Sequence, residues 1–227
     1  MVMQKNRPRT NGKRTFIFDM DGTLVDNMRF HSQAWMALFE SLGIHLEADE
    51  FQRRTAGKTN PEILRKFTGC DLTDGEIQVL SDQKENFYRD LYRPHLKATT
   101  GLLPFLRQAQ ELNIPMGLAT AAGQENIAFI LNELKLGDFF CAIVGAEDIQ
   151  KGKPDPEIFI KSAYKLHAQP EDCIVFEDSL FGVEAAQRAG MRAVFITTSH
   201  QPEDLGNQPT VMLAVPDFSS LDIKVLV

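Results

Sequence analysis

Short apolar runs recur along the chain, and patterns of helical periodicity separate most of them. The β-prone runs lie at 16–18, 116–120, 142–145, 173–176 and 193–196, and a later run at 211–214 is expected to form an edge strand. Amphipathic patterns typical of helices fall between them, at 102–112, 125–134, 157–166 and 180–189. Alternating strands and helices indicate βαβ units, so we predict an α/β fold built on a parallel sheet.

The pattern changes between positions 28 and 95, where no clear strand run occurs. Apolar residues such as Phe30, Trp35 and Phe39 recur at helical spacing, and Gly43 follows as a plausible helix stop. We therefore predict an all-helical insert after the first strand. The predicted division is a flexible basic tail at 1–14, a core made of 15–27 and 98–227, and the insert at 28–97.

Composition narrows the class of protein. The 227 residues contain 43% hydrophobic residues, which is ample for a core, and the net charge is −7. An acidic balance disfavours a general nucleic-acid binder. The sequence contains no run of about 18 apolar residues, so we expect no membrane span. The tail lacks the apolar region of a signal peptide, and a transit peptide fits less well because no apolar helical face accompanies its arginines. Three widely spaced cysteines are typical of reduced thiols, so we expect a cytoplasmic location. We expect the protein to be a monomer.

The first strand ends in two acids that are separated by one residue. Asp19 and Asp21 are followed at once by Gly22 and Thr23. Two like charges this close need a cation or a proton to coexist. One carboxylate can attack an electrophile and a second can transfer a proton. Turn or capping acids are the alternative interpretation, and an EF-hand loop fails because Phe30 would occupy its twelfth position.

Three further motifs lie at predicted strand ends or in the adjoining loops. Thr120 ends one strand, Lys153 precedes the stiff segment Pro154-Asp155-Pro156, and Glu177 with Asp178 ends another strand. A hydroxyl and an ammonium suit phosphoryl oxygens, and paired acids suit Mg²⁺. Each alone has an ordinary alternative: a helix start, a solvated lysine or a capping acid. Because parallel strands share one carboxyl edge, the set predicts a Mg²⁺ site with a nucleophile, a proton shuttle and two phosphate-holding groups.

In their order and spacing these four motifs resemble those of the haloacid-dehalogenase-like superfamily, and the insert resembles the helical cap of its β-phosphoglucomutase and phosphoglycolate-phosphatase branch. The resemblance implies a Rossmann-like, three-layer core with an all-helical cap. It implies that Asp19 is the nucleophile, that Asp21 is the acid and base, and that Thr120 and Lys153 hold the phosphoryl group. It also implies Mg²⁺ as cofactor, held by Asp19, the backbone carbonyl of Asp21, Glu177 and Asp178.

The same resemblance bears on the substrate. In the mutase branch, a lysine before a cap-loop glycine and an arginine three residues after it grip a distal phosphate. Aligning Gly57 places Ala56 and Asn60 at those positions, so we expect hydrolysis of a small phosphorylated metabolite, with a sugar phosphomutase as the alternative. The candidate substrate contacts are His31, Arg54, Gly57, Lys58 and Ala121.

A phosphorylation-dependent regulator is the non-enzyme alternative. Response-regulator receivers also use acids, a hydroxyl and a lysine on a parallel sheet, but their phosphorylated aspartate ends a mid-chain strand. The mid-chain strands of this chain end at Thr120 and Gly145, and neither position holds an acid. We therefore expect a phosphatase that acts on a small metabolite, with neither a nucleic acid nor a membrane as partner.

Overall fold

The computed structural model describes residues 14–47, 51, 55, 58–69 and 71–227. Six strands form one sheet in the order β3-β2-β1-β4-β5-β6, and every neighbouring pair is parallel. The strands are β1 (Thr15–Phe18), β2 (Met116–Ala119), β3 (Ala142–Val144), β4 (Cys173–Glu177), β5 (Arg192–Ile196) and β6 (Val211–Val215). The predicted parallel α/β fold is confirmed, and β6 is an edge strand, as expected.

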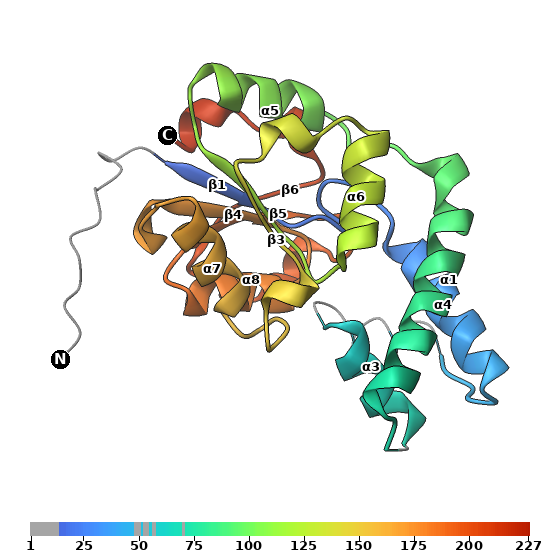
Figure 1. Cartoon of the computed structure of the whole chain (residues 1–227). Coiled ribbons are helices and arrows are strands. Elements are labelled where there is room, and N and C mark those ends of the chain that lie inside the picture. The colour runs from blue at the N-terminus through green and yellow to red at the C-terminus, as the bar shows by residue number, and fades with distance from the viewer. Residues whose placement is uncertain (1–13, 48–50, 52–54, 56–57, 70) are drawn as a thin grey trace.

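Helices cover both faces of the sheet, as Figure 1 shows. They are α5 (Leu102–Glu111), α6 (Gln124–Glu133), α7 (Glu157–Lys165) and α8 (Leu180–Arg188). Side chains along a strand point alternately to the two faces of the sheet, so β1 contributes to the apolar clusters on both faces. Phe16 and Phe18 join the cluster that includes α5 and α6, whereas Ile17 joins the cluster that includes α7 and α8. Short 3₁₀ turns connect these elements at Arg93–His95, Gly137–Phe139, Ala146–Asp148, Pro170–Asp172, Pro202–Leu205, Phe218–Ser220 and Ile223–Val225.

A separate group of helices follows β1 and lies beside the sheet layers (Figure 1). It contains α1 (Met28–Ser41), α3 (Asn60–Thr68) and α4 (Asp74–Tyr92), and no strand occurs among its described residues. Trp35, Phe39 and Leu64 belong to a third apolar cluster of its own. Gly43 follows α1 with a φ of 72°, in agreement with the predicted helix stop. The division into core and cap stays a prediction, and residues 1–13 of the tail lie outside the described range.

The order of the strands reverses at β1. β1 is flanked by β2 on one side and by β4 on the other, and the chain runs outward in both directions from this point. In open parallel sheets a ligand crevice forms outside the carboxyl ends of the strands at such a switch point. Within the described residues, none of the helices has the length and hydrophobicity needed to cross a bilayer.

Candidate active site

The turn after β1 presses its backbone against another strand end. Asp19 follows β1 directly and is buried. Gly22 has a φ of +82°, and a Cβ at this position would lie 2.0 Å from Oδ2 of Asp178. Only glycine satisfies both conditions, because a side chain would be strained and would collide with that carboxylate. The glycine thus lets the loop that carries Asp21 lie beside the acids that end β4.

Lys153 lies between two carboxylates that come from different strands. Its Nζ donates to Oδ1 of Asp19 at 2.6 Å and also donates to Oε1 of Glu177. All three side chains are buried. The other oxygen of Glu177, Oε2, accepts from the backbone N of Ser179 at 2.7 Å and from its Oγ at 2.9 Å. Because the ammonium is buried and doubly paired, the interpretation of Lys153 as a solvated lysine is wrong.

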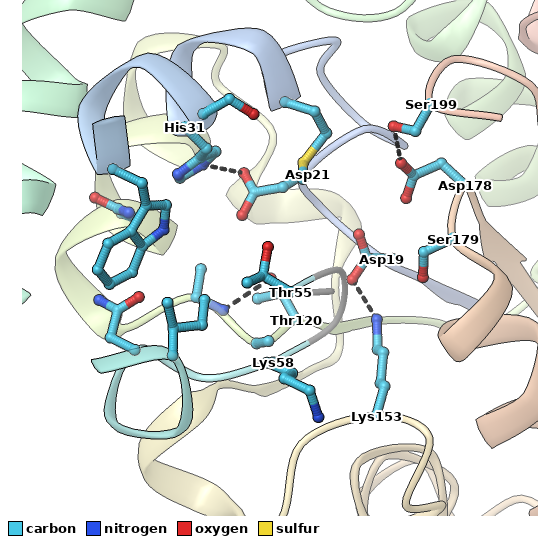
Figure 2. Close-up of a pocket in the computed structure, with 18 of the residues that line it drawn as sticks. Asp19, Asp21, His31, Thr55, Lys58, Thr120, Lys153, Asp178, Ser179 and Ser199 are labelled. Atoms are coloured by element: carbon cyan, nitrogen blue, oxygen red, sulfur yellow. Dashed lines mark hydrogen bonds and ion pairs between the residues drawn. The ribbon is translucent and has the colours of Figure 1, made fainter. Parts of the chain in front are cut away.

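Asp178 and Lys153 lie on different sides of Asp19 (Figure 2). Oδ2 of Asp178 accepts a hydrogen bond from the Oγ of Ser199, and the backbone O of Asp178 lies 3.1 Å from Nδ1 of His200. Asp178 does not cap α8: Ser179 does so, since its Oγ accepts from the backbone N of Gly182 at 3.0 Å. The alternative interpretation of Asp178 as a capping acid is therefore wrong, and its carboxylate faces the pocket.

The buried charges at this edge do not balance. Among the described residues at this edge, the buried carboxylates are those of Asp19, Glu177 and Asp178, and the buried ammonium is that of Lys153, which pairs with the first two. Burial raises the pKa of Asp19 to about 8, with Lys153 opposing the rise and Glu177 adding to it. Burial, Glu177 and Asp19 together raise the pKa of Asp178 well above its usual value.

This donor set fits a hard divalent cation, because its oxygens are carboxylates and its excess charge is negative. Among the described residues, however, no three His, Cys, Asp or Glu side chains are grouped closely enough to enclose a metal. Lys153 occupies the space between Asp19 and Glu177. The chemistry of the donors, rather than a formed coordination shell, is therefore what supports a cation here.

The second acid of the pair, Asp21, faces the helical segment. Its Oδ1 accepts from Nδ2 of Asn27 at 2.6 Å and lies 3.4 Å from Nε2 of His31. Burial alone would raise the pKa of Asp21, but His31 and the hydrogen bond from Asn27 outweigh it and lower that pKa below its usual value. Nδ1 of His31 lies 2.8 Å from Nζ of Lys84, so a chain of polar contacts runs from Asp21 to α4.

One pocket brings the predicted residues together. Asp19, Asp21, Thr120, Lys153, Glu177 and Asp178 line it, as do the substrate candidates His31, Lys58 and Ala121. Thr120 is buried at the end of β2, and its Oγ1 accepts from the backbone N of Ala122 at 3.1 Å. Figure 2 shows Asp19 directed at Lys153, Asp21 turned toward His31, and Asp178 beside Ser199. Arg54 and Gly57 lie outside the described residues.

Comparison with known proteins decides the family. A profile of the haloacid dehalogenase-like hydrolases matches residues 16–196, which include all four motifs. The chain belongs to this hydrolase family. β-Phosphoglucomutase of Bacillus subtilis is 36% identical over 191 residues, which cover 80% of this chain and 82% of that protein.

Other relatives of the family extend this picture. The chloroplastic 5-amino-6-(5-phospho-D-ribitylamino)uracil phosphatase of Arabidopsis thaliana is 28% identical over 92% of this chain, which spans only 57% of that relative. A solved β-phosphoglucomutase from Clostridium difficile superposes with a TM-score of 0.83 at 27% identity, covering 94% of this chain and 95% of the other. The Rossmann-like core and the resemblance to this family are confirmed.

Several residues of the pocket carry no motif in the sequence. Lys84 and Glu85 come from the middle of α4 and Asn126 from the first turn of α6, and charged and amide side chains on helices ordinarily face solvent. Ser199 and His200 follow β5, and their place at a strand end is a signal by which they were predictable. Asn27 precedes α1 and does not line the pocket, but it contacts Asp21, which does.

Proposed function

We propose that the chain is a Mg²⁺-dependent phosphomonoester hydrolase. It acts on a small phosphorylated metabolite, such as a sugar phosphate, through an aspartyl-phosphate intermediate on Asp19. The observation that carries the proposal is the convergence of Asp19, Asp21, Lys153 and Asp178 in one pocket at the strand-order reversal. Family membership and a phosphatase among the relatives support it.

Asp19 is the proposed phosphoryl acceptor. One of its oxygens forms a bond to phosphorus while the ester P–O bond breaks, and the leaving oxygen takes a proton from Asp21. Lys153 and Thr120 hold the phosphoryl oxygens, and Lys153 also keeps the Asp19 carboxylate oriented through its hydrogen bond to Oδ1. Water then attacks phosphorus, Asp21 takes its proton, and the bond to Asp19 breaks.

Asp21 must be protonated for the first step. In the free protein its carboxyl is held ionised by His31 and Asn27, which lower its pKa. A phosphate dianion placed beside it favours the neutral form and raises that pKa, so substrate binding itself supplies the acid. A positioned acid and base of this kind contributes a rate factor of about 10²–10⁴.

Asp19, Asp178 and the backbone carbonyl of Asp21 would hold Mg²⁺, with Glu177 beside them. When bound, the ion would neutralise the excess carboxylate charge and polarise the phosphoryl oxygens. Lys153 would remain paired with Glu177 and close to the phosphoryl group. His31, Lys58 and Ala121 are proposed as substrate contacts because they line the same pocket.

The second candidate is a sugar phosphomutase, which the 36% identity to β-phosphoglucomutase favours. A mutase must bind a second phosphate in the cap. Asn60, which the resemblance places at the position of the phosphate-binding arginine, instead donates from Nδ2 to Oε1 of Glu85 at 2.7 Å. A neutral amide that is already bonded to a carboxylate is a poor anion grip, and this favours hydrolysis.

The test is phosphate release from an aryl phosphate and from a panel of sugar phosphates, with and without Mg²⁺. The proposal expects metal-dependent release that Asp19→Asn abolishes while the protein stays folded. Isomerisation of glucose 1-phosphate in the presence of its bisphosphate, faster than hydrolysis, would replace the proposal with the mutase. A stable phosphoprotein with no turnover would favour the regulator.

A further inference from the structure

Glu85 on α4 places an ionised carboxylate in the wall of the pocket that the strand-end acids also line. Its side chain is 17% exposed. Oε1 accepts from Nδ2 of Asn60 at 2.7 Å and from Nζ of Lys84 at 2.8 Å, and Oε2 accepts from Nδ2 of Asn126 at 2.6 Å. Burial would raise the pKa of Glu85, but Lys84, His31 and the hydrogen bond from Asn60 lower it to about 2.

The ammonium of Lys84, which contacts Glu85, also has other partners. Nζ of Lys84 contacts Glu85 and Nδ1 of His31, and it lies 5.0 Å from the ring of Trp35 and 5.5 Å from that of Tyr88. Its charge is therefore balanced by a carboxylate and partly by two aromatic faces. The ammonium of Lys58 lies elsewhere, 5.9 Å from the ring of Phe181 at the start of α8.

In the proposed reaction, the leaving group lies beside Asp21, in the pocket that Glu85 also lines. Asp21, which donates the proton to the leaving oxygen, lines the same pocket, and the charge of Glu85 acts on Asp21 directly. A leaving group that extends from Asp21 toward α4 therefore meets Glu85, Asn60 and Asn126. A carboxylate offers about four acceptor sites. Hydrogen bonds from the described part of the chain use three of those of Glu85, which leaves one there to accept from a hydroxyl.

We propose that Glu85 is a specificity-determining residue that selects phosphomonoesters of uncharged, hydroxyl-bearing alcohols and rejects substrates with a second anionic group. The inference rests on the proposed function and deepens it. A second phosphate or carboxylate would lie beside a buried negative charge, and like charges are costly at low effective dielectric. Among the described residues, Lys84 is shared between Glu85 and His31, and the Arg89 guanidinium is held by Asn126 and Glu125. A hydroxyl instead gains a charge-assisted hydrogen bond.

The experiment compares two esters that share one phosphorylated carbon, fructose 1-phosphate and fructose 1,6-bisphosphate. kcat/KM for the release of the first phosphate is measured with Mg²⁺ for the wild type and for Glu85→Gln, which removes the charge at constant size. Glu184→Gln is the matched control, because that glutamate pairs with Arg188 on the surface of α8. The wild type should prefer the monophosphate at least tenfold, and Glu85→Gln should reduce the preference about tenfold.

A wild type that uses the bisphosphate equally well overturns the inference. So does a Glu85→Gln variant that changes both rates by the same factor, since that result assigns Glu85 only to holding α4 against α6. Calorimetric binding of both esters to Asp19→Asn, with and without Glu85→Gln, reads the same preference without chemistry. Where Glu85→Gln fails to fold, Glu85→Asp keeps the charge on a shorter side chain and should keep the preference for the monophosphate, and its loss there overturns the inference. If the wild type releases phosphate from no ester, the proposed function fails, and the binding preference still decides the inference separately.

Discussion

The stability of the protein should depend on Glu85 between pH 4.5 and 2. The pKa of Glu85 is lowered from 4.5 to about 2, so its folded state favours the ionised form. A carboxyl group whose pKa is lower in the folded state stabilises the fold at pH values above its unfolded-state pKa, which is 4.5 for Glu85. This stabilisation is lost as the pH falls through the folded-state pKa. At 1.36 kcal/mol per pKa unit, the shift corresponds to about 3 kcal/mol at pH 7 and to less than half of that at pH 3.

Urea unfolding of the wild type and of Glu85→Gln, at several pH values in the same salt, measures this contribution. The variant should be less stable by about 3 kcal/mol at pH 7, and the gap should narrow as the pH falls below 4.5. Glu184→Gln, which breaks an exposed ion pair, should differ from the wild type by less than about 1 kcal/mol throughout. A gap between wild type and Glu85→Gln that stays constant from pH 7 to pH 3 would refute the reasoning.

Two further predictions concern the turn after β1 and the residue that contacts Asp178. Gly22→Ala should destabilise the fold by at least about 1–2 kcal/mol and abolish turnover, because φ is positive at this position and an added Cβ would collide with Asp178. Gly75→Ala is the control: this glycine near the start of α4 has open space around it, so the substitution should be neutral or stabilising in the same unfolding assay. Ser199→Ala removes the hydrogen bond to Oδ2 of Asp178, so the Mg²⁺ concentration for half-maximal activity should rise about tenfold; an unchanged metal requirement would contradict the assignment of Asp178.

The strands and their terminal residues could be predicted from the sequence for a simple physical reason. A buried parallel strand reads as a short apolar run, so Asp19, Thr120 and Glu177 are recognisable as polar residues that interrupt such runs. Their convergence then follows, because parallel strands end at one edge.

The helical side of the pocket could not be predicted in the same way. Lys84 and Glu85 lie in a helix with many charged residues, and only the packing of α4 beside His31 and Asn126 buries them. Such burial depends on tertiary contacts that helical periodicity does not encode. Ser199 is intermediate in how far it could be predicted. Its place after β5 is visible in the sequence, but only the folded loop brings it to Asp178.

The central claim is that Asp19 accepts the phosphoryl group. The most direct measurement is borohydride trapping during turnover with Mg²⁺ and a phosphate ester, followed by mass spectrometry of the peptide that contains the first strand. An acyl phosphate is reduced by borohydride whereas a free carboxylate is not, so reduction at residue 19 that depends on the substrate is the predicted result. Full turnover with no reduction at this position, or with reduction at Asp21 or Asp178 instead, would contradict the account.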